Sequence, residues 1–271
     1  MILVNGCPGE HVAATDRGLL LGDGLFETLR MRNGQPQLWD YHWRRLTEGL
    51  ERLGIAAPDP VQCREELRRV APGPVALARL TVTRGSGPRG YRPPEPAHPT
   101  RIVSGSSDSG AVADPWKPPV LRLGWGPVAL GINPVLAGLK HTSRLEHVLA
   151  RSAWEPGWDE AILRDARDRV VSATQGNLWV RDGNTLITPP VDEAGIAGTR
   201  RAWILEHARS FGMRVEVAYP TPGQVREADG LYVSNARLGI VPAHLEETEI
   251  ERRAWQDDPV STLGNALHEA P

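Results

Sequence analysis

One lysine is the residue of this chain best suited to covalent chemistry. Of the 31 basic residues among 271, two are lysines, Lys117 and Lys140, and the other 29 are arginines. A coding bias toward arginine can produce this ratio, but a guanidinium stays protonated, whereas an amine can lose its proton and attack a carbonyl carbon. Lys140 ends the apolar run Pro134–Leu139, and apolar surroundings favour the neutral amine. Lys140 is therefore a candidate for Schiff-base chemistry, whereas Lys117 is typical of a surface linker.

The elements that must position this lysine begin with short strands and helices. Asp40 is suited to cap a helix that runs to Leu53, and Asp59–Pro60 opens a second helix. Ala78–Thr83 alternates like a half-buried strand. The segment Ser104–Gly110 has the composition of a flexible connector.

The rest of the chain has the pattern of a second α/β domain. Arg144–Trp154 is an amphipathic helix, whose inner side we expect to carry Leu145, Val148 and Leu149. Asp182–Asn184 is typical of a hairpin turn, and Gly198–Phe211 is helical.

These patterns predict a mixed α/β (α+β) fold of two domains. The smaller N-terminal domain spans residues 1–105, a linker spans 106–112, and the larger domain of residues 113–271 carries the lysine. Two domains that meet at a linker leave a cleft, which is the usual place for a small ligand.

Composition excludes several classes of protein. The formal net charge of -2 argues against a protein that binds nucleic acid or an anionic membrane. No apolar run reaches the ~18 residues that a membrane span needs, and Met1–Glu10 has no pattern of a signal peptide. Cys7 and Cys63 do not form a convincing metal site or disulfide framework. We therefore expect a soluble, reduced, cytoplasmic protein without a metal ion.

Several segments, in this order, resemble the signatures of the class IV pyridoxal-phosphate enzymes, whose fold is fold type IV. The family includes branched-chain and D-amino-acid aminotransferases and aminodeoxychorismate lyases. Each segment alone is a weak signal, but the ordered set extends over nearly the whole chain. The segments are Asp16–Gly18 with Gly22–Thr28, His42–Leu46, Lys140–Glu146, Gly195–Arg201 and Ser234–Ala236.

The resemblance implies which residues hold pyridoxal 5'-phosphate in the interdomain cleft. Lys140 would form the Schiff base with the cofactor aldehyde and then move protons. Arg45 and the helix start at Thr199 and Arg200 would hold the phosphate. On the residues alone, a solvated helix-surface arginine is the favoured interpretation of Arg45. The remaining cofactor contacts would come from Ser172, Ile196, Asn235 and Ala236.

Three features resemble the aminodeoxychorismate lyases within this family. The loop Arg84–Tyr91 resembles their R-G-x-G-x-R-G-Y segment, although a glycine-rich surface turn is the alternative. Arg144–Glu146, after the lysine, is also similar to the lyases. Thr28 sits where lyases carry a threonine that is thought to donate a proton. Arg84 and Arg89 suit a substrate with two carboxylates.

Ser172 departs from the family pattern. It occupies the position of a glutamate that usually contacts the pyridine nitrogen. A carboxylate keeps that nitrogen protonated, which amino transfer relies on, whereas elimination needs less electron withdrawal. Ser172 therefore disfavours an aminotransferase more than a lyase, and loss of activity is a further alternative.

The resemblance predicts a lyase that converts 4-amino-4-deoxychorismate to 4-aminobenzoate and pyruvate, for folate synthesis. Lys140 would remove the C4 proton of the substrate ring, and Thr28 would protonate the departing enolpyruvate. The alternatives are a class IV aminotransferase for branched-chain or D-amino acids and a non-catalytic protein that binds pyridoxal phosphate or another anion. The resemblance also implies a homodimer.

Overall fold

Two β-sheets organise the chain, each in its own unit. The computed structural model describes residues 1–107, 117–247 and 255–271. Unit 1 comprises Met1–Ala111, Leu139–Ser143 and Pro271, and unit 2 comprises Val112–Gly138 and Arg144–Ala270. Among the described residues, no helix has both the length and the apolar character needed to cross a bilayer.

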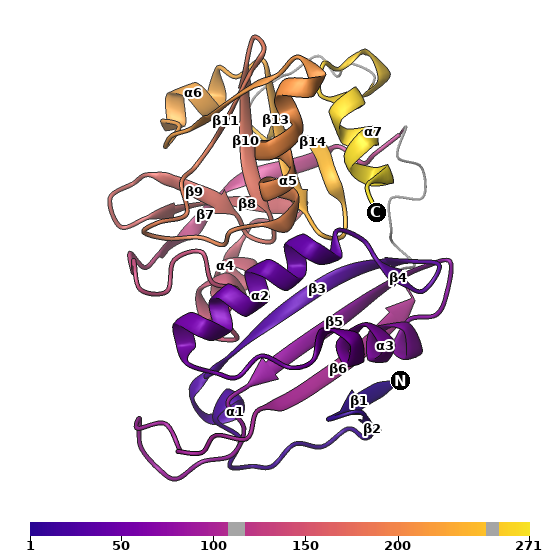
Figure 1. Cartoon of the computed structure of the whole chain (residues 1–271). Helices are drawn as coiled ribbons and strands as arrows, with labels where there is room; N and C mark the ends of the chain where they lie inside the picture. Colours follow the sequence, from indigo (N-terminus) through magenta and orange to yellow (C-terminus); the bar gives the residue numbers. More distant parts are fainter. Residues whose placement is uncertain (108–116, 248–254) are drawn as a thin grey trace. The chain divides into compact units, whose positions relative to one another are not determined.

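Unit 1 contains a six-stranded sheet in the order β2-β1-β6-β5-β3-β4. All its neighbouring strands are antiparallel, and the two longer helices, α2 and α3, lie on one face of the sheet (Figure 1). Its elements are β1 (Ile2–Val4), β2 (Cys7–Pro8), α1 (Arg17–Leu21), β3 (Gly24–Arg32), β4 (Gln35–Pro36), α2 (Trp39–Leu53), α3 (Pro60–Val70), β5 (Val75–Thr83) and β6 (Thr100–Ser107).

Both helices of this layer follow the sequence signals, with one difference at the start of α2. The side chain of Asp59 accepts a hydrogen bond from the Val61 amide and caps α3, as predicted. The cap of α2 is Leu38, in the left-handed conformation at φ 52°, so the prediction of Asp40 as the cap was wrong. Leu38 is buried, and its amide donates to the Pro271 carbonyl at 2.6 Å. The helix thus begins at Trp39, before Asp40, because tertiary contacts fix the backbone of Leu38.

The two faces of β3 and β5 differ in what they present. The buried face, toward the helices, carries Leu25, Leu29, Ala78, Leu80 and Val82. Residues one position before or after these point to the opposite face, because side chains alternate along a strand. Phe26, Thr28 and Arg79 are therefore on the side of the sheet away from the helices.

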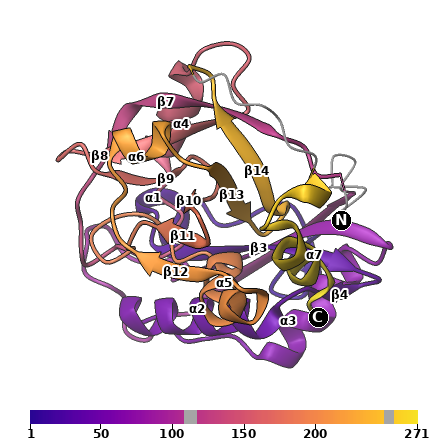
Figure 2. The same ribbon diagram turned by 90° about the horizontal axis from the view of Figure 1, so that it is seen from above.

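Unit 2 contains an eight-stranded mixed sheet in the order β12-β11-β10-β13-β14-β7-β8-β9. Apolar residues from β7, β8, β10, β13 and β14 form its main core, and α5 packs beside α7 (Figure 2). Its elements are β7 (Leu121–Leu130), α4 (Leu145–Ala153), β8 (Glu160–Asp165), β9 (Val170–Ala173), β10 (Asn177–Asp182), β11 (Thr185–Thr188), α5 (Thr199–His207), the 3₁₀ helix η1 (Ala208–Phe211), β12 (Arg214–Val217), α6 (Pro222–Arg226), β13 (Gly230–Asn235), β14 (Gly239–Leu245), the 3₁₀ helix η2 (Trp255–Asp257) and α7 (Ser261–Glu269).

The apolar side of α4 corrects a prediction. Leu145, Val148 and Leu149, expected to face inward, are 75%, 55% and 58% exposed within this chain, whereas Ala150 is buried in the core. Helical periodicity identifies an apolar face but not what covers it. In unit 2 the small side chain of Ala150 lets the helix approach the sheet, and the larger apolar residues point outward.

The expected connector and the position of the lysine also differ from the prediction. Residues 104–107 continue strand β6 and pair with β5, so a flexible connector does not begin at Ser104. The rest of the predicted linker, residues 108–112, lies outside the described residues. Leu139–Ser143 packs with unit 1 rather than with the C-terminal segment in which the sequence analysis placed Lys140.

Candidate active site

Lys140 lies on a short segment that pairs with the start of β3. The Phe26 amide donates to the Lys140 carbonyl at 2.9 Å, and Leu25 and His141 form an isolated antiparallel bridge. The Thr142 hydroxyl and amide donate to the carbonyls of Gly22 and Gly24 at 2.8 and 3.0 Å. The backbone of this segment is therefore fixed on both sides of Lys140, whereas Lys117, the other lysine, is exposed.

The Lys140 amine lies over an aromatic ring that it shares with an arginine. Its Nζ is 4.4 Å from the centre of the buried Phe26 ring, and the guanidinium carbon of Arg79 is 3.7 Å from that centre. Arg79 is directly opposite Thr28 in the β3–β5 register, and Thr28 shares a strand face with Phe26. The structure therefore gathers an amine, a guanidinium and a half-buried hydroxyl on one face. Arg79 does not stand out in the sequence, because a lone arginine in an alternating strand has the same pattern as a solvated strand face.

Arg45, the predicted phosphate ligand, has a carboxylate partner that the sequence analysis did not identify. Its Nε donates to Glu27 Oε1 at 2.8 Å, and its Nη2 donates to Oε2. His42 Nδ1 is 2.6 Å from the same carboxylate. Burial alone raises the pKa of Glu27, but the Arg45 charge and the His42 hydrogen bond lower it to about 2. Arg45 is therefore half of a buried ion pair, which reduces the charge that it could offer to a phosphate.

The first signature motif, at residues 16–18, is structural in this protein. Asp16 caps α1 by accepting from the Gly18 amide at 2.8 Å, and its other oxygen accepts from the hydroxyls of Thr83 and Thr100. A Cβ at Gly18 would lie 2.2 Å from a Thr83 methyl group, so glycine is required there. These contacts fasten α1 to the ends of β5 and β6, between which the predicted substrate loop runs.

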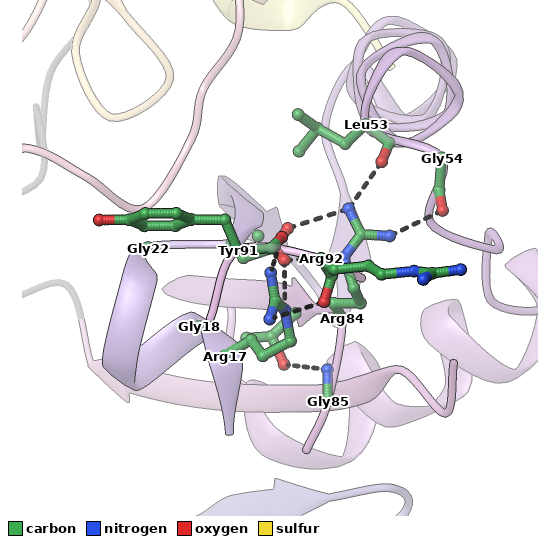
Figure 3. A network of polar contacts seen from close by, with 12 residues as sticks. Arg17, Gly18, Gly22, Leu53, Gly54, Arg84, Gly85, Tyr91 and Arg92 are labelled. Carbon is green, nitrogen blue, oxygen red and sulfur yellow. Dashed lines mark hydrogen bonds and ion pairs between the residues drawn. The ribbon is translucent and has the colours of Figure 1, made fainter. Parts of the chain in front are cut away.

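Arg84, a predicted substrate ligand, is bonded on several sides to other residues of unit 1. It is 6% exposed and pairs with Asp23 through Nε and Nη2 at 2.7 and 3.1 Å. Its Nη1 and Nη2 also donate to the carbonyls of Gly54 and Leu53, at the end of α2 (Figure 3). Four of its five N–H groups are used in these bonds. Arg84 therefore has a structural role in unit 1, and four N–H groups bonded within the chain disfavour the prediction that it binds substrate.

Arg17 completes this network from the other side of Asp23. Its Nε donates to Asp23 Oδ2 at 2.9 Å. Its two Nη atoms donate to the carbonyls of Gly90, Tyr91 and Arg92, at 3.0, 3.0 and 3.4 Å. Both guanidiniums therefore donate to the Asp23 carboxylate, and Figure 3 shows the two arginines close together. Burial raises the pKa of Asp23, but the hydrogen bonds and charges of the two arginines outweigh burial and lower it.

The side chains of the loop point away from this network. Tyr91 is 87% exposed, and its ring projects outward in Figure 3. Arg89 is exposed as well, and it forms no hydrogen bond or ion pair with any residue that the structure describes. Arg89, unlike Arg84, is therefore available to a ligand.

In unit 2 the predicted cofactor residues come together around the start of α5. The turn before it is held by Asn177, whose side-chain amide donates to the Ile196 carbonyl at 2.9 Å. The turn also pairs with Gly138, two residues before Lys140, through bonds of 3.0 Å to Gly195 and Ala197. Helix α5 begins at Thr199 after Gly198, which has no side chain to cap it. A helix start of this kind favours an anion such as a phosphate.

Arg200 joins this turn to the segment Ser234–Ala236. Its Nη2 donates to the Ala236 carbonyl at 3.2 Å, so two predicted cofactor residues are in direct contact. The Asn235 side-chain oxygen accepts from the amides of Arg237 and Leu238 and shapes the β13–β14 turn. Asn235 is thus occupied on one side in holding its own turn.

Ser172 is buried on β9, where it pairs with Leu163 of β8. A carboxylate does occur near the end of this strand, because Glu160 Oε2 accepts from the Gln175 amide at 3.1 Å. Burial raises the pKa of Glu160 to about 7, against the opposing effect of backbone hydrogen bonds from Gln175, Thr174 and Ala161. This carboxyl group is anchored to the turn after β9 and is a structural partner of that turn.

Comparison with known proteins finds relatives along nearly the whole chain. A family model described as Amino-transferase class IV matches residues 24–245. The chain is 33% identical over 245 residues to an aminodeoxychorismate lyase of Vibrio harveyi, covering 89% of this chain and 90% of that one. It is 29% identical over 271 residues to a putative branched-chain-amino-acid aminotransferase of Methanocaldococcus jannaschii, covering 95% and 89%. The crystal structure of 4-amino-4-deoxychorismate lyase from Pseudomonas aeruginosa superimposes with a TM-score of 0.85 at 36% identity, covering 99% and 97%.

Proposed function

Because the chain belongs to the amino-transferase class IV family, we propose that it is an aminodeoxychorismate lyase. The reaction converts 4-amino-4-deoxychorismate to 4-aminobenzoate and pyruvate, with pyridoxal 5'-phosphate as cofactor. The observation that carries the proposal is the similarity to two lyases along nearly the whole chain. The exposed guanidinium of Arg89 also supports the lyase proposal, because the substrate has two carboxylates that an arginine can bind.

The residues of this chain fit the cofactor in charge and chemistry. The uncapped start of α5, with Thr199 and Arg200, suits its phosphate. Lys140 is the amine for its aldehyde, and Ile196 offers an apolar surface to its ring. When bound, pyridoxal phosphate supplies an aldehyde that captures amines and a ring that accepts electron density. We assign the remaining contacts to Arg45, Ser172, Asn235 and Ala236.

Lys140 and Thr28 would move the protons of the reaction. The Lys140 amine takes the proton from the substrate carbon that bears the nitrogen, and the enolpyruvyl group leaves from the adjacent carbon as the ring becomes aromatic. Thr28, beside Phe26 on the same strand face, gives a proton to the enolpyruvate, which becomes pyruvate. No oxidant or other co-reactant is needed, so the task of the protein is to hold geometry and transfer protons.

Two arginines are our candidates for the substrate carboxylates. Arg89 has no partner among the described residues, and Arg79 shares the Phe26 ring with the Lys140 amine. Arg79 replaces Arg84 in this proposal, because Arg84 is occupied by Asp23 and by the end of α2.

The apolar side of α4 supports a homodimer. Leu145, Val148 and Leu149 are spaced on one helical face and exposed within this chain, and an apolar patch of this kind favours contact with another subunit. We also expect a cytoplasmic enzyme, consistent with two free cysteines among the described residues, Cys7 and Cys63.

Amino transfer is the second candidate, favoured by the similarity to the branched-chain aminotransferase. The buried hydroxyl of Ser172, in place of a carboxylate, predicts that amino transfer is slow. We expect Ser172→Glu to increase the amino transfer rate relative to the lyase rate. An unchanged ratio would contradict our account of this residue.

The direct test is incubation of the purified protein, loaded with pyridoxal phosphate, with 4-amino-4-deoxychorismate. We expect stoichiometric release of pyruvate and 4-aminobenzoate. Absence of both products from protein that shows a Lys140-dependent visible absorbance band would refute the lyase. Turnover of amino acids by that protein would then support the aminotransferase, and no turnover of any amine would indicate a protein that only binds the cofactor.

A further inference from the structure

We propose that Arg17 is a positioning residue, which holds the loop Gly85–Arg92 in the conformation that presents Arg89 and Tyr91 to the substrate. The inference rests on the proposed function, because it assigns substrate recognition to that loop. Arg17 lies in the first signature motif, which the chemistry of the site does not otherwise use.

The main observation is that one guanidinium holds three consecutive carbonyls. Gly90, Tyr91 and Arg92 all turn their backbone oxygens toward Arg17, which is 4% exposed. Gly90 has a φ of +96°, a conformation that suits glycine and lets the chain curve around the guanidinium. The carbonyls of this stretch point to Arg17, and the side chains of Tyr91 and Arg92 are exposed.

The same guanidinium is anchored to the body of unit 1. Its Nε donates to Asp23 Oδ2, and the same oxygen accepts from Arg84 Nε. The Arg17 amide donates to the Gly85 carbonyl at 2.9 Å, and a Cβ at Gly87 would lie 3.0 Å from Arg17 Cδ. The loop is therefore fastened at its first residue, along its course and at its far end by one residue.

The geometry suits an arginine, whose N–H groups are mostly used within the chain. A planar guanidinium can donate in several directions of one plane, whereas a lysine ammonium is a compact point charge on a flexible stem. Four of the five N–H groups of Arg17 are used within the chain. Its effect on the reaction is therefore transmitted through the position of Arg89 and Tyr91.

The kinetic test compares Arg17→Gln and Arg17→Lys with the wild-type enzyme. We expect Arg17→Gln to raise KM for 4-amino-4-deoxychorismate at least tenfold, which corresponds to about 1.4 kcal/mol, while kcat and the absorbance band of the loaded enzyme change less than twofold. The KM of Arg17→Lys should lie between the values of the wild-type enzyme and Arg17→Gln. The matched control is Arg101→Gln, which removes another buried arginine–carboxylate pair, with Glu66, away from the loop. It should lower the melting temperature and leave KM within twofold.

A second readout does not depend on activity. Trypsin cleavage after Arg89 is compared with cleavage after Arg167, an exposed residue in a turn of unit 2. We expect Arg17→Gln to increase the ratio of the two rates at least fivefold, and Arg101→Gln to leave the ratio unchanged. If the wild-type protein does not act on 4-amino-4-deoxychorismate, the proposed function fails, and this ratio still decides whether Arg17 holds the loop. An unchanged ratio, or an unchanged KM in active Arg17→Gln enzyme, would overturn the inference.

Discussion

Glu27 and Arg45 form a two-point ion pair between strand β3 and helix α2, and His42 contacts the same carboxylate. Glu27 is 2% exposed, so its charge is stable there only because of these partners. The pair joins the strand that receives the lysine segment to the helix that carries the predicted phosphate ligand.

Removing the Glu27 carboxylate should lower stability in a pH-dependent way. Its pKa falls from an ordinary value of 4.5 to about 2 on folding, so its contribution is complete above pH 4.5 and is lost as the pH falls toward 2. We expect Glu27→Gln to reduce the free energy of unfolding by roughly 3 kcal/mol at pH 7 and by much less near pH 2. Urea unfolding at both pH values measures this, with the exposed Glu65→Gln as control. An equal loss at both pH values would contradict an ionised Glu27.

The two lysines provide a matched test of covalent chemistry. We expect Lys140→Ala to lose the visible absorbance band of the loaded protein and all lyase activity, because no other residue supplies an amine at that position. Lys117→Ala, at the exposed lysine, should retain both. Borohydride reduction followed by peptide mapping should place the pyridoxyl group on Lys140. An adduct on Lys117 or on the N-terminal amine would show that the assignment is incorrect.

The two arginines of the loop should separate binding from stability. Arg84→Gln breaks a buried pair with Asp23, and we expect a loss of about 3–5 kcal/mol in the free energy of unfolding. Arg89→Gln is expected to change stability by less than about 0.5 kcal/mol and to raise KM for the substrate at least tenfold. Thermal melts and steady-state kinetics on both variants measure the two effects. A stable Arg84→Gln with raised KM would return Arg84 to the substrate site.

Glu160 should make the protein less stable at alkaline pH. Burial raises its pKa from 4.5 to about 7, so its contribution to stability is complete below pH 4.5 and is lost as the pH rises through 7. We expect this group to lower the free energy of unfolding by about 1.4 kcal/mol between pH 6 and 8, with a matching fall in melting temperature, and Glu160→Gln to remove that part of the fall. The exposed Glu155→Gln is the control. Parallel melting curves for wild type and Glu160→Gln at pH 6 and 8 would rule out the raised pKa.

A charge on the outer face of α4 should disrupt a dimer. Val148→Glu places a carboxylate among Leu145 and Leu149, and we expect sedimentation to show monomers at concentrations at which the wild type is a dimer. Val61→Glu changes a residue that is 73% exposed on α3, outside this patch, and should leave the dimer intact. Monomeric wild-type protein would refute the homodimer itself.

Sequence patterns located the local structure well where a residue's own chemistry determines it. Asp59 caps α3, and the turn at Asp182–Asn184 joins β10 and β11, as expected. The predictions from sequence patterns were wrong where contacts with distant residues determine the local structure. Leu38 starts α2 because Pro271 is nearby, and the large side chains of α4 point outward because Ala150 contacts the core. Pro271 is far from Leu38 in the sequence, and the core residues that Ala150 contacts, such as Leu130 and Leu163, are far from α4.

The same limit applies to the candidate site. Family resemblance identified the loop Arg84–Tyr91, but two arginines five positions apart look alike until burial separates them. Arg84 is surrounded by acceptors, and Arg89 is not. Arg79 became a candidate only when the β3–β5 register placed it opposite Thr28.

The division of the chain has a consequence for dissecting the protein into fragments. Residues 139–143 belong to unit 1 although the segments before and after them belong to unit 2. A polypeptide cut after residue 111 would carry β3 without its bridge partner His141 and without Lys140. A single proteolytic cut at the boundary therefore leaves the N-terminal fragment without five residues of unit 1. These residues, Leu139–Ser143, remain on the C-terminal fragment, so reconstitution would require them to pair again with β3.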